Sequence, residues 1–153
     1  MKHLQTCGII LLFALFSLTS FAQNIPINEP NYSKPKLFQD LPERIPIQVS
    51  LLQSLLAFTM GQTINVQLAN NFPLQGHIVS SANKYNNGVQ SVVITLTNRV
   101  GATLSITKIK DTDGTVKYTG RIISMQHGDA FEISSENGQY YLIKKAFYDM
   151  INE

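Results

Sequence analysis

The triplet His127-Gly128-Asp129 contains the residue types that are best suited to chemistry in this sequence. An imidazole and a carboxylate beside a flexible glycine can share a proton or bind a metal ion. Arg121 could assist such a site, and His77 is the only other histidine after the first 22 residues. Two histidines fall short of the three protein ligands of a catalytic zinc site, so we interpret the triplet first as a loop with Gly128 in a left-handed conformation.

Other catalytic patterns are incomplete. The run from Asp111 to Gly114 resembles the start of a calcium loop, but Ile122 stands where the twelfth-position glutamate is required. Glu132 and Glu136 could form a carboxylate pair, although Glu136 belongs to a predicted turn. The sequence has no Gly-x-Ser-x-Gly elbow and no glycine-rich phosphate loop. We therefore expect no metal ion and no cofactor.

One segment near the C-terminus has the composition of a binding surface. In an extended strand, Tyr140 and Lys144 face one side, whereas Tyr141 and Lys145 face the other, and Tyr148 follows shortly after. Both faces of this strand are thus partly apolar. We take these five residues as candidates for contact with a partner.

The first 22 residues have the pattern of an export signal. Lys2 precedes an apolar run that ends in small residues before Gln23, and the run is too short to span a membrane. Cys7 lies before this run rather than after it, which argues against a lipoprotein. We therefore expect a soluble periplasmic or secreted protein that has no cysteine and no membrane insertion after cleavage.

The remaining 131 residues suffice for one domain with a packed core. They carry 11 basic and 10 acidic residues without a basic cluster, which argues against nucleic acid as a partner. Residues 23–40 contain three prolines and no apolar periodicity, and they read as a leader or linker. We expect a single β-rich domain over residues 41–153.

Apolar periodicity predicts the elements of that domain. Within residues 41–60, the apolar stripe from Val49 to Thr59 repeats at helical spacing, and Pro42 and Pro46 must precede the helix or lie in its first turn. Alternating apolar residues then predict about seven strands, joined by short turns that include Asn-Gly and Asp-Gly pairs. A short helix is expected from Phe147 onward. The fold class is mainly β, an antiparallel meander that forms a curled sheet or a partly closed barrel.

These observations favour an exported, non-catalytic module that binds another protein or a surface polymer. One alternative is a small hydrolase or metal-dependent enzyme centred on His127 and Asp129, with help from Arg121. A second alternative is an inhibitor or folding aid of a co-exported enzyme. The sequence alone leaves all three open.

Overall fold

A computed structural model describes residues 31–70 and 72–151 of the chain. The predicted export signal with Cys7, and residues 23–30 of the predicted leader, lie outside the described residues. Residues 31–40 contain turns and bends without a helix or strand, yet Phe38 within them is fully buried. None of the helices in the described ranges is long and apolar enough to cross a membrane.

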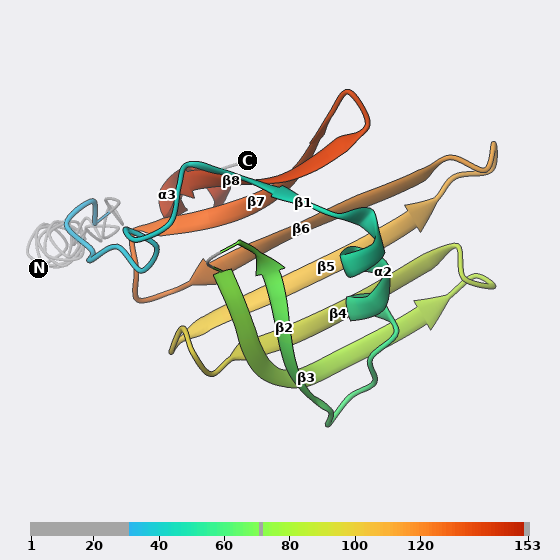
Figure 1. Cartoon of the computed structure of the whole chain (residues 1–153), viewed down its shortest axis with the longest axis horizontal. Coiled ribbons are helices and arrows are strands. Elements are labelled where there is room, and N and C mark those ends of the chain that lie inside the picture. Colours follow the sequence, from blue (N-terminus) through green and yellow to red (C-terminus); the bar gives the residue numbers. More distant parts are fainter. Residues whose placement is uncertain (1–30, 71, 152–153) are drawn as a thin grey trace, which may run out of the picture. The chain divides into compact units, whose positions relative to one another are not determined.

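An antiparallel sheet of eight strands dominates the structure (Figure 1). Strands β2 to β8 follow one another as a meander, and β1 pairs with β8 at the far edge. Two short helices complete the fold within the described residues. The elements are β1 (Arg44–Ile47), α2 (Val49–Leu56), β2 (Thr63–Ala69), β3 (Phe72–Lys84), β4 (Val89–Leu96), β5 (Ala102–Lys110), β6 (Val116–Ser124), β7 (Asp129–Glu136), β8 (Gln139–Ala146) and α3 (Phe147–Ile151).

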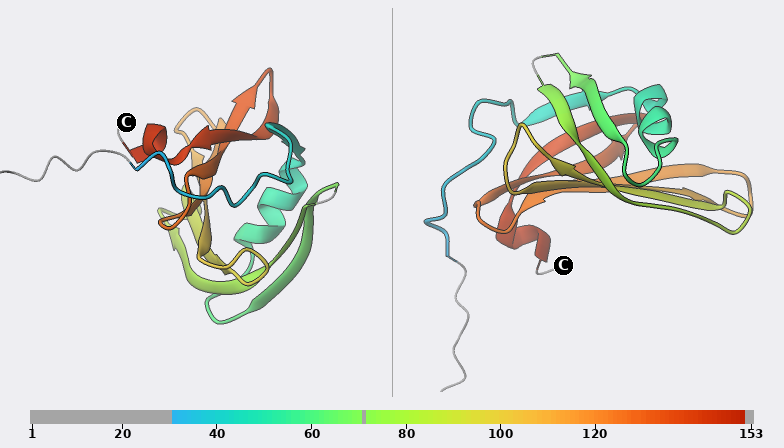
Figure 2. Two further views of the ribbon diagram at one scale, coloured as in Figure 1. Left: turned by 90° about the vertical axis from the view of Figure 1, so that its left-hand side faces the viewer. Right: turned by 90° about the horizontal axis from the view of Figure 1, so that it is seen from below.

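The predicted fold class is confirmed, because the sheet curls into a half-barrel (Figure 2). Helix α2 lies against the concave face of the sheet, where it buries Leu52, Leu55 and Leu56. The helix is shorter than the predicted stripe and ends at Leu56 rather than just before Gly61. The buried side chains of the concave face and of α2 form one apolar core.

Strand β1 is the element that the sequence prediction missed. It has only four residues, and prolines stand before and within it. Ile45 and Ile47 are nonetheless buried while Arg44 and Pro46 are exposed, which is the alternation of a strand. Proline is tolerated here because β1 lies at the edge of the sheet and Pro46 needs no hydrogen bond on its outer side.

Gly120 marks a close approach between strands. A β-carbon at this position would lie 2.2 Å from the carbonyl oxygen of Ser105 and 3.0 Å from Cδ1 of Ile133. The register between β5 and β6 continues past Gly120 without a bulge. The absent side chain therefore allows the sheet to curl tightly at this point.

Candidate functional site

Gly128 and Asp129 of the predicted triplet hold the N-terminal strap, by which we mean residues 34–41, against the sheet. Both carboxylate oxygens of Asp129 accept backbone N–H groups, that of Leu37 at 2.6 Å and that of Phe38 at 2.9 Å. The N–H of Gly128 donates to the carbonyl of Pro35 at 2.9 Å. Gly128 does not adopt the predicted left-handed conformation; a β-carbon there would instead lie 3.0 Å from the carbonyl oxygen of Lys34 in the strap. Asp129 is only 3 % exposed, and each of its two carboxylate oxygens has a hydrogen-bond partner in these amides.

The other members of the predicted catalytic group lie elsewhere. Nδ1 of His127 is 2.8 Å from Oγ of Ser124, next to it in the same turn. Arg121 pairs with Glu132 in the sheet register and faces the convex side, whereas Asp129 faces the concave side. His77 is exposed on β3, with Nδ1 3.2 Å from Oγ1 of Thr63. Within residues 31–70 and 72–151, no three His, Cys, Asp or Glu side chains are grouped so that they could hold a metal ion.

The strap is also fixed at its other end by Arg99. This guanidinium donates to both carboxylate oxygens of Asp40, at 2.9 and 2.5 Å, and to the carbonyl of Leu37 at 3.0 Å. The hydrogen bonds from Arg99 hold the pKa of Asp40 below its ordinary value. Contacts at both ends therefore make the strap part of the folded domain.

The five candidate binding residues of the C-terminal segment do not share one surface. Tyr140 is buried, and its hydroxyl accepts the N–H of Tyr118 at 3.1 Å. Lys144 donates to the carbonyl of Leu41 at 2.6 Å and lies 3.2 Å from Oε1 of Glu43. Two of the five residues thus serve contacts inside the domain.

The other three candidates lie on the convex face of β8 or on α3. The ring of Tyr141 carries the Arg44 guanidinium 3.6 Å from its centroid. Nζ of Lys145 is 3.8 Å from Oε2 of Glu132, and Tyr148 packs on Tyr32 with 5.6 Å between ring centroids. Each of these three side chains thus has a partner within the domain.

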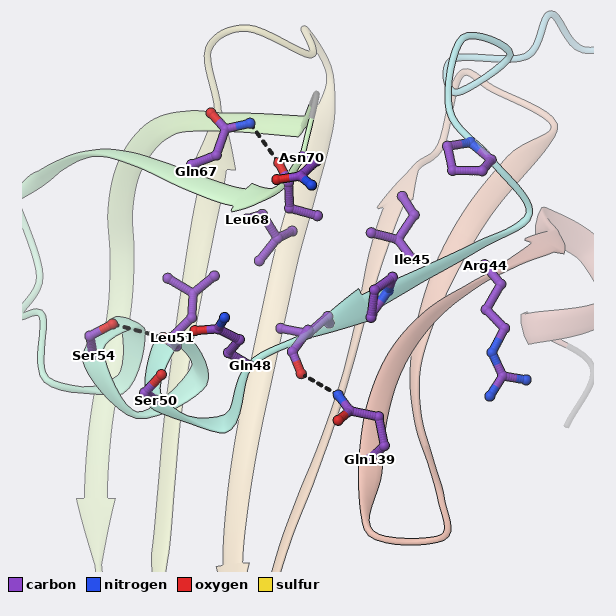
Figure 3. A pocket seen from close by; sticks show the side chains of 14 residues that line it. Arg44, Ile45, Gln48, Ser50, Leu51, Ser54, Gln67, Leu68, Asn70 and Gln139 are labelled. Atoms are coloured by element: carbon purple, nitrogen blue, oxygen red, sulfur yellow. Dashed lines mark hydrogen bonds between the residues drawn. The ribbon is translucent and has the colours of Figure 1, made fainter.

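A cleft that the sequence did not reveal lies where the half-barrel stays open. Its volume is about 900 Å³, and its walls come from β1, the start of α2 and the end of β2 (Figure 3). We call it the seam cleft, because β1 and β2 are the two edges of the sheet. It is lined by Pro42, Arg44, Ile45, Pro46, Ile47, Gln48, Ser50, Leu51, Ser54, Gln67, Leu68, Ala69, Asn70 and Gln139.

The lining of the seam cleft combines apolar and amide side chains. Ile45, Leu51 and Leu68 come from its three walls and provide an apolar interior. The amide of Gln139 donates to the carbonyl of Ile47 at 3.0 Å, which ties the start of β8 to the end of β1. Gln48 makes no capping hydrogen bond to α2 with its side chain, so its amide can serve a ligand.

Arg44 is the one charged residue among the described residues that line the cleft. Its Nη2 atom lies 2.7 Å from Oε2 of Glu136, and its side chain extends to the side of β1 away from Leu68 (Figure 3). The contact with Tyr141 and then the Glu136 carboxylate raise the pKa of Arg44. Since Glu136 balances this cation, the cleft presents little net charge to a ligand.

The sequence could have pointed to this cleft only if β1 had been recognised as a strand. The alternation of Ile45 and Ile47 between prolines was the available signal, but four residues are too few to separate a strand from a helix start. No protein-family model, curated protein or solved structure matches the chain. The geometry of the described residues therefore carries the functional argument by itself.

Proposed function

We propose that this protein is an exported, non-catalytic binding module whose ligand enters the seam cleft. The observation that carries the proposal is the cleft itself, a mixed apolar and amide cavity of about 900 Å³ between two sheet edges and a helix. Cavities of this size with a few polar groups are typical of ligand sites. The engagement of Asp129 by the strap also supports a role other than proton transfer for that carboxylate.

Export is the part of the proposal that rests on sequence alone. The apolar run before Gln23 supports cleavage by a signal peptidase. Intact-mass measurement of the protein recovered from the producing cells and from their medium tests this point. We expect a chain that begins at Gln23 outside the cytoplasm, and an uncleaved cytoplasmic chain would contradict export.

Site-specific photo-crosslinking tests the binding role. A benzoylphenylalanine at Ser50 reports on the cleft, and the same group at Thr95, which is exposed on the convex side of β4, serves as the control. We expect adducts from Ser50 and none from Thr95 when the full chain is expressed in its own cells. Ser54→Trp, which fills the cleft from α2, should abolish the adduct from Ser50.

Equal crosslinking at both positions, or none at Ser50, would contradict the binding proposal. Circular dichroism and thermal unfolding of the Ser54→Trp variant show whether the domain keeps its fold. Because Ser54 is exposed and donates only to the carbonyl of Leu51 in its own helix, we expect the fold to persist.

A further inference from the structure

We propose that Asn137 is a modification site, where the chain deamidates its own asparagine and where the isoaspartate product loosens the pairing of β1 with β8. This inference concerns covalent chemistry at the turn between β7 and β8 and is independent of the proposed function. It follows from a comparison of the three turns in which asparagine or aspartate precedes glycine: Asn87-Gly88, Asp113-Gly114 and Asn137-Gly138.

The reaction uses only the chain and water. The glycine nitrogen, after losing its proton to hydroxide, attacks Cγ of the preceding asparagine, so that an N–Cγ bond forms and the Cγ–Nδ2 bond breaks. The side-chain nitrogen takes a proton from water and leaves as ammonia, and a succinimide ring remains. Water then opens one of the two ring C–N bonds, which gives aspartate or isoaspartate. Glycine favours the attack because it has no side chain to obstruct its nitrogen.

The turn at Asn137-Gly138 leaves the reacting groups free. It is a two-residue connection between Glu136 and Gln139, which pair with each other at the ends of β7 and β8. Within residues 31–70 and 72–151, the N–H of Gly138 donates to no acceptor. The side chain of Asn137 is exposed, and the space beside Gly138 is open for 4 Å around the position of a β-carbon. The nitrogen can therefore lose its proton, and the asparagine side chain can turn toward it.

The turn at Asn87-Gly88 holds the same two groups in place. The N–H of Gly88 donates to the carbonyl of Tyr85 at 2.9 Å, and Oδ1 of Asn87 accepts a hydrogen bond from Nδ2 of Asn83 at 2.5 Å. An N–H that is bound to a carbonyl is harder to deprotonate. The asparagine must also release its partner before it can turn toward the glycine. Both contacts slow deamidation at Asn87.

The turn at Asp113-Gly114 is protected in a similar way. The N–H of Gly114 donates to the carbonyl of Asp111 at 3.0 Å, and Oδ1 of Asp113 accepts the N–H of Thr115 at 2.8 Å. The hydrogen bond from Thr115 holds the pKa of Asp113 below its ordinary value, and an ionised carboxylate resists attack by a nucleophile. Among the three turns, only Asn137-Gly138 thus combines a free glycine N–H with a free amide side chain.

Isoaspartate at this turn would change the β7–β8 hairpin. It routes the main chain through the side-chain carbon and so adds one methylene between Glu136 and Gln139. The amide of Gln139 donates to the carbonyl of Ile47 at 3.0 Å, which ties the start of β8 to the end of β1. A lengthened turn shifts Gln139, so the end of β1 loses this support.

The pairing of Ile47 with Tyr140 is the nearest reporter of that change. The N–H of Lys144 donates to the carbonyl of Glu43 at 2.8 Å, and the strands continue in register to Ile47 and Tyr140. Hydrogen-bonded pairs alternate along an antiparallel ladder, so Ile47 and Tyr140 also form such a pair. Hydrogen exchange at the amide of Ile47 therefore measures how firmly β1 is held beside the turn.

The test follows the turns within one full-length chain. The protein is kept in mildly alkaline buffer, sampled over time, digested with trypsin and analysed by fragmentation mass spectrometry. Trypsin releases Asn137 in the peptide 122–144, where it is the only asparagine, and Asn87 in the peptide 85–99. Conversion of the amide to an acid changes the mass of each peptide, and isoaspartyl methyltransferase identifies isoaspartate.

We expect Asn137 to convert about tenfold faster than Asn87 in the folded protein, which corresponds to the contribution of one hydrogen bond to the barrier. In guanidinium chloride the two asparagines should convert at similar rates, because both precede glycine and the fold is lost. Asn83→Ala releases the side chain of Asn87 and should speed its conversion without affecting Asn137. Equal rates in the folded protein, faster conversion at Asn87, or no conversion at Asn137 would overturn the proposal.

Hydrogen exchange tests the effect on β1. Protein aged until position 137 carries isoaspartate should exchange the amide of Ile47 faster than fresh protein. Asn137→Asp is the matched control, because it adds the charge without the extra methylene, and its exchange at Ile47 should equal that of fresh protein. Unchanged exchange in the aged protein, or equal acceleration in Asn137→Asp, would overturn the effect of the lengthened turn on the β1–β8 pair.

Discussion

Asp129 binds two consecutive backbone amides of a segment that lies 91 and 92 residues earlier in the chain. A carboxylate in this position acts as a clamp, because each of its oxygens accepts one N–H. The sequence pattern singled out Asp129 but not the backbone amides that it binds. A contact to main-chain groups leaves no side-chain pattern in the strap residues by which it could be recognised. Such long-range contacts can be found only once the fold is known.

Asp129→Ala tests the clamp. The substitution leaves the N–H groups of Leu37 and Phe38 without a partner in a buried site, so we expect the free energy of unfolding to fall by about 3 kcal/mol. Urea-induced unfolding measures this loss. Asp149→Ala, at an exposed carboxylate of α3, is the control and should change stability by less than about 0.5 kcal/mol. Equal effects would contradict the clamp.

Tyr118 and Tyr140 form a matched pair of buried tyrosines with opposite roles. The hydroxyl of Tyr118 is buried and has no hydrogen-bond partner among the described residues, whereas that of Tyr140 accepts the N–H of Tyr118. Tyr118→Phe should therefore leave stability unchanged or raise it by about 1 kcal/mol. Tyr140→Phe should lower it by about 1–2 kcal/mol, since a buried donor loses its partner. Thermal unfolding of both variants measures these changes in stability. A larger loss of stability in Tyr118→Phe than in Tyr140→Phe would contradict the two contacts.

The ion pair of Asp40 with Arg99 gives a pH dependence with a defined sign. Hydrogen bonds from Arg99 lower the pKa of Asp40 in the folded protein, so its contribution is present above the unfolded pKa of about 4. That contribution is lost as the pH falls through the lowered pKa. Asp40 is 59 % exposed, which limits the effect to below about 1 kcal/mol. Stability curves of the protein and of Asp40→Asn should differ at pH 7 and converge in acid.

At the scale of elements, the strands joined by hairpins, β2 to β8, could be predicted from the sequence, whereas the edge strand β1 could not. The turn at Asn137-Gly138 has positive φ angles of 51° and 78°, as an Asn-Gly hairpin requires. Strand β1 instead takes its identity from pairing with β8, almost one hundred residues later. Its local sequence, with two prolines, is compatible with several conformations. The seam cleft was unpredictable for the same reason, because one of its walls is β1.

Gly120→Ala tests the curl of the sheet. Its new methyl group would meet the Ser105 carbonyl, which is backbone and cannot rotate away, so β5 and β6 must separate locally. We expect a loss of about 3 kcal/mol in chemical unfolding, at the upper end for overpacking. Thr119→Ala, on the neighbouring position of the same strand, should cost much less. A tolerated alanine would contradict the close approach.

At the scale of the whole molecule, one side chain links distant parts of the core. Phe38 from the strap is fully buried, and its ring centroid lies 5.1 Å from that of Phe131 and 6.5 Å from that of Phe72. The strap, β7 and β3 meet in this aromatic cluster. The sequence placed Phe38 in a leader because its neighbours show no apolar period.

Phe38→Ala should destabilise the entire domain rather than release the strap alone. Removing a fully buried phenylalanine leaves a cavity between three elements, which costs about 4 kcal/mol. We expect the urea-unfolding curves measured by far-ultraviolet circular dichroism and by tyrosine fluorescence to shift together to lower urea concentration. Phe58→Ala, at a partly buried position, provides the comparison and should cost less. Separate transitions would show that the strap folds independently.

The pairing of β1 with β8 determines how the domain responds to mechanical tension. Tyr32 contacts Tyr148, and Arg44 at the start of β1 lies opposite Ile143 near the end of β8. A force pulling residues 31 and 151 apart would therefore load the strap and then this strand pair from one end, breaking its bonds one after another. Strands loaded in this way yield at lower force than strands that must slide past each other. Since β1 forms one wall of the seam cleft, separation of β1 from β8 under tension would open the cleft.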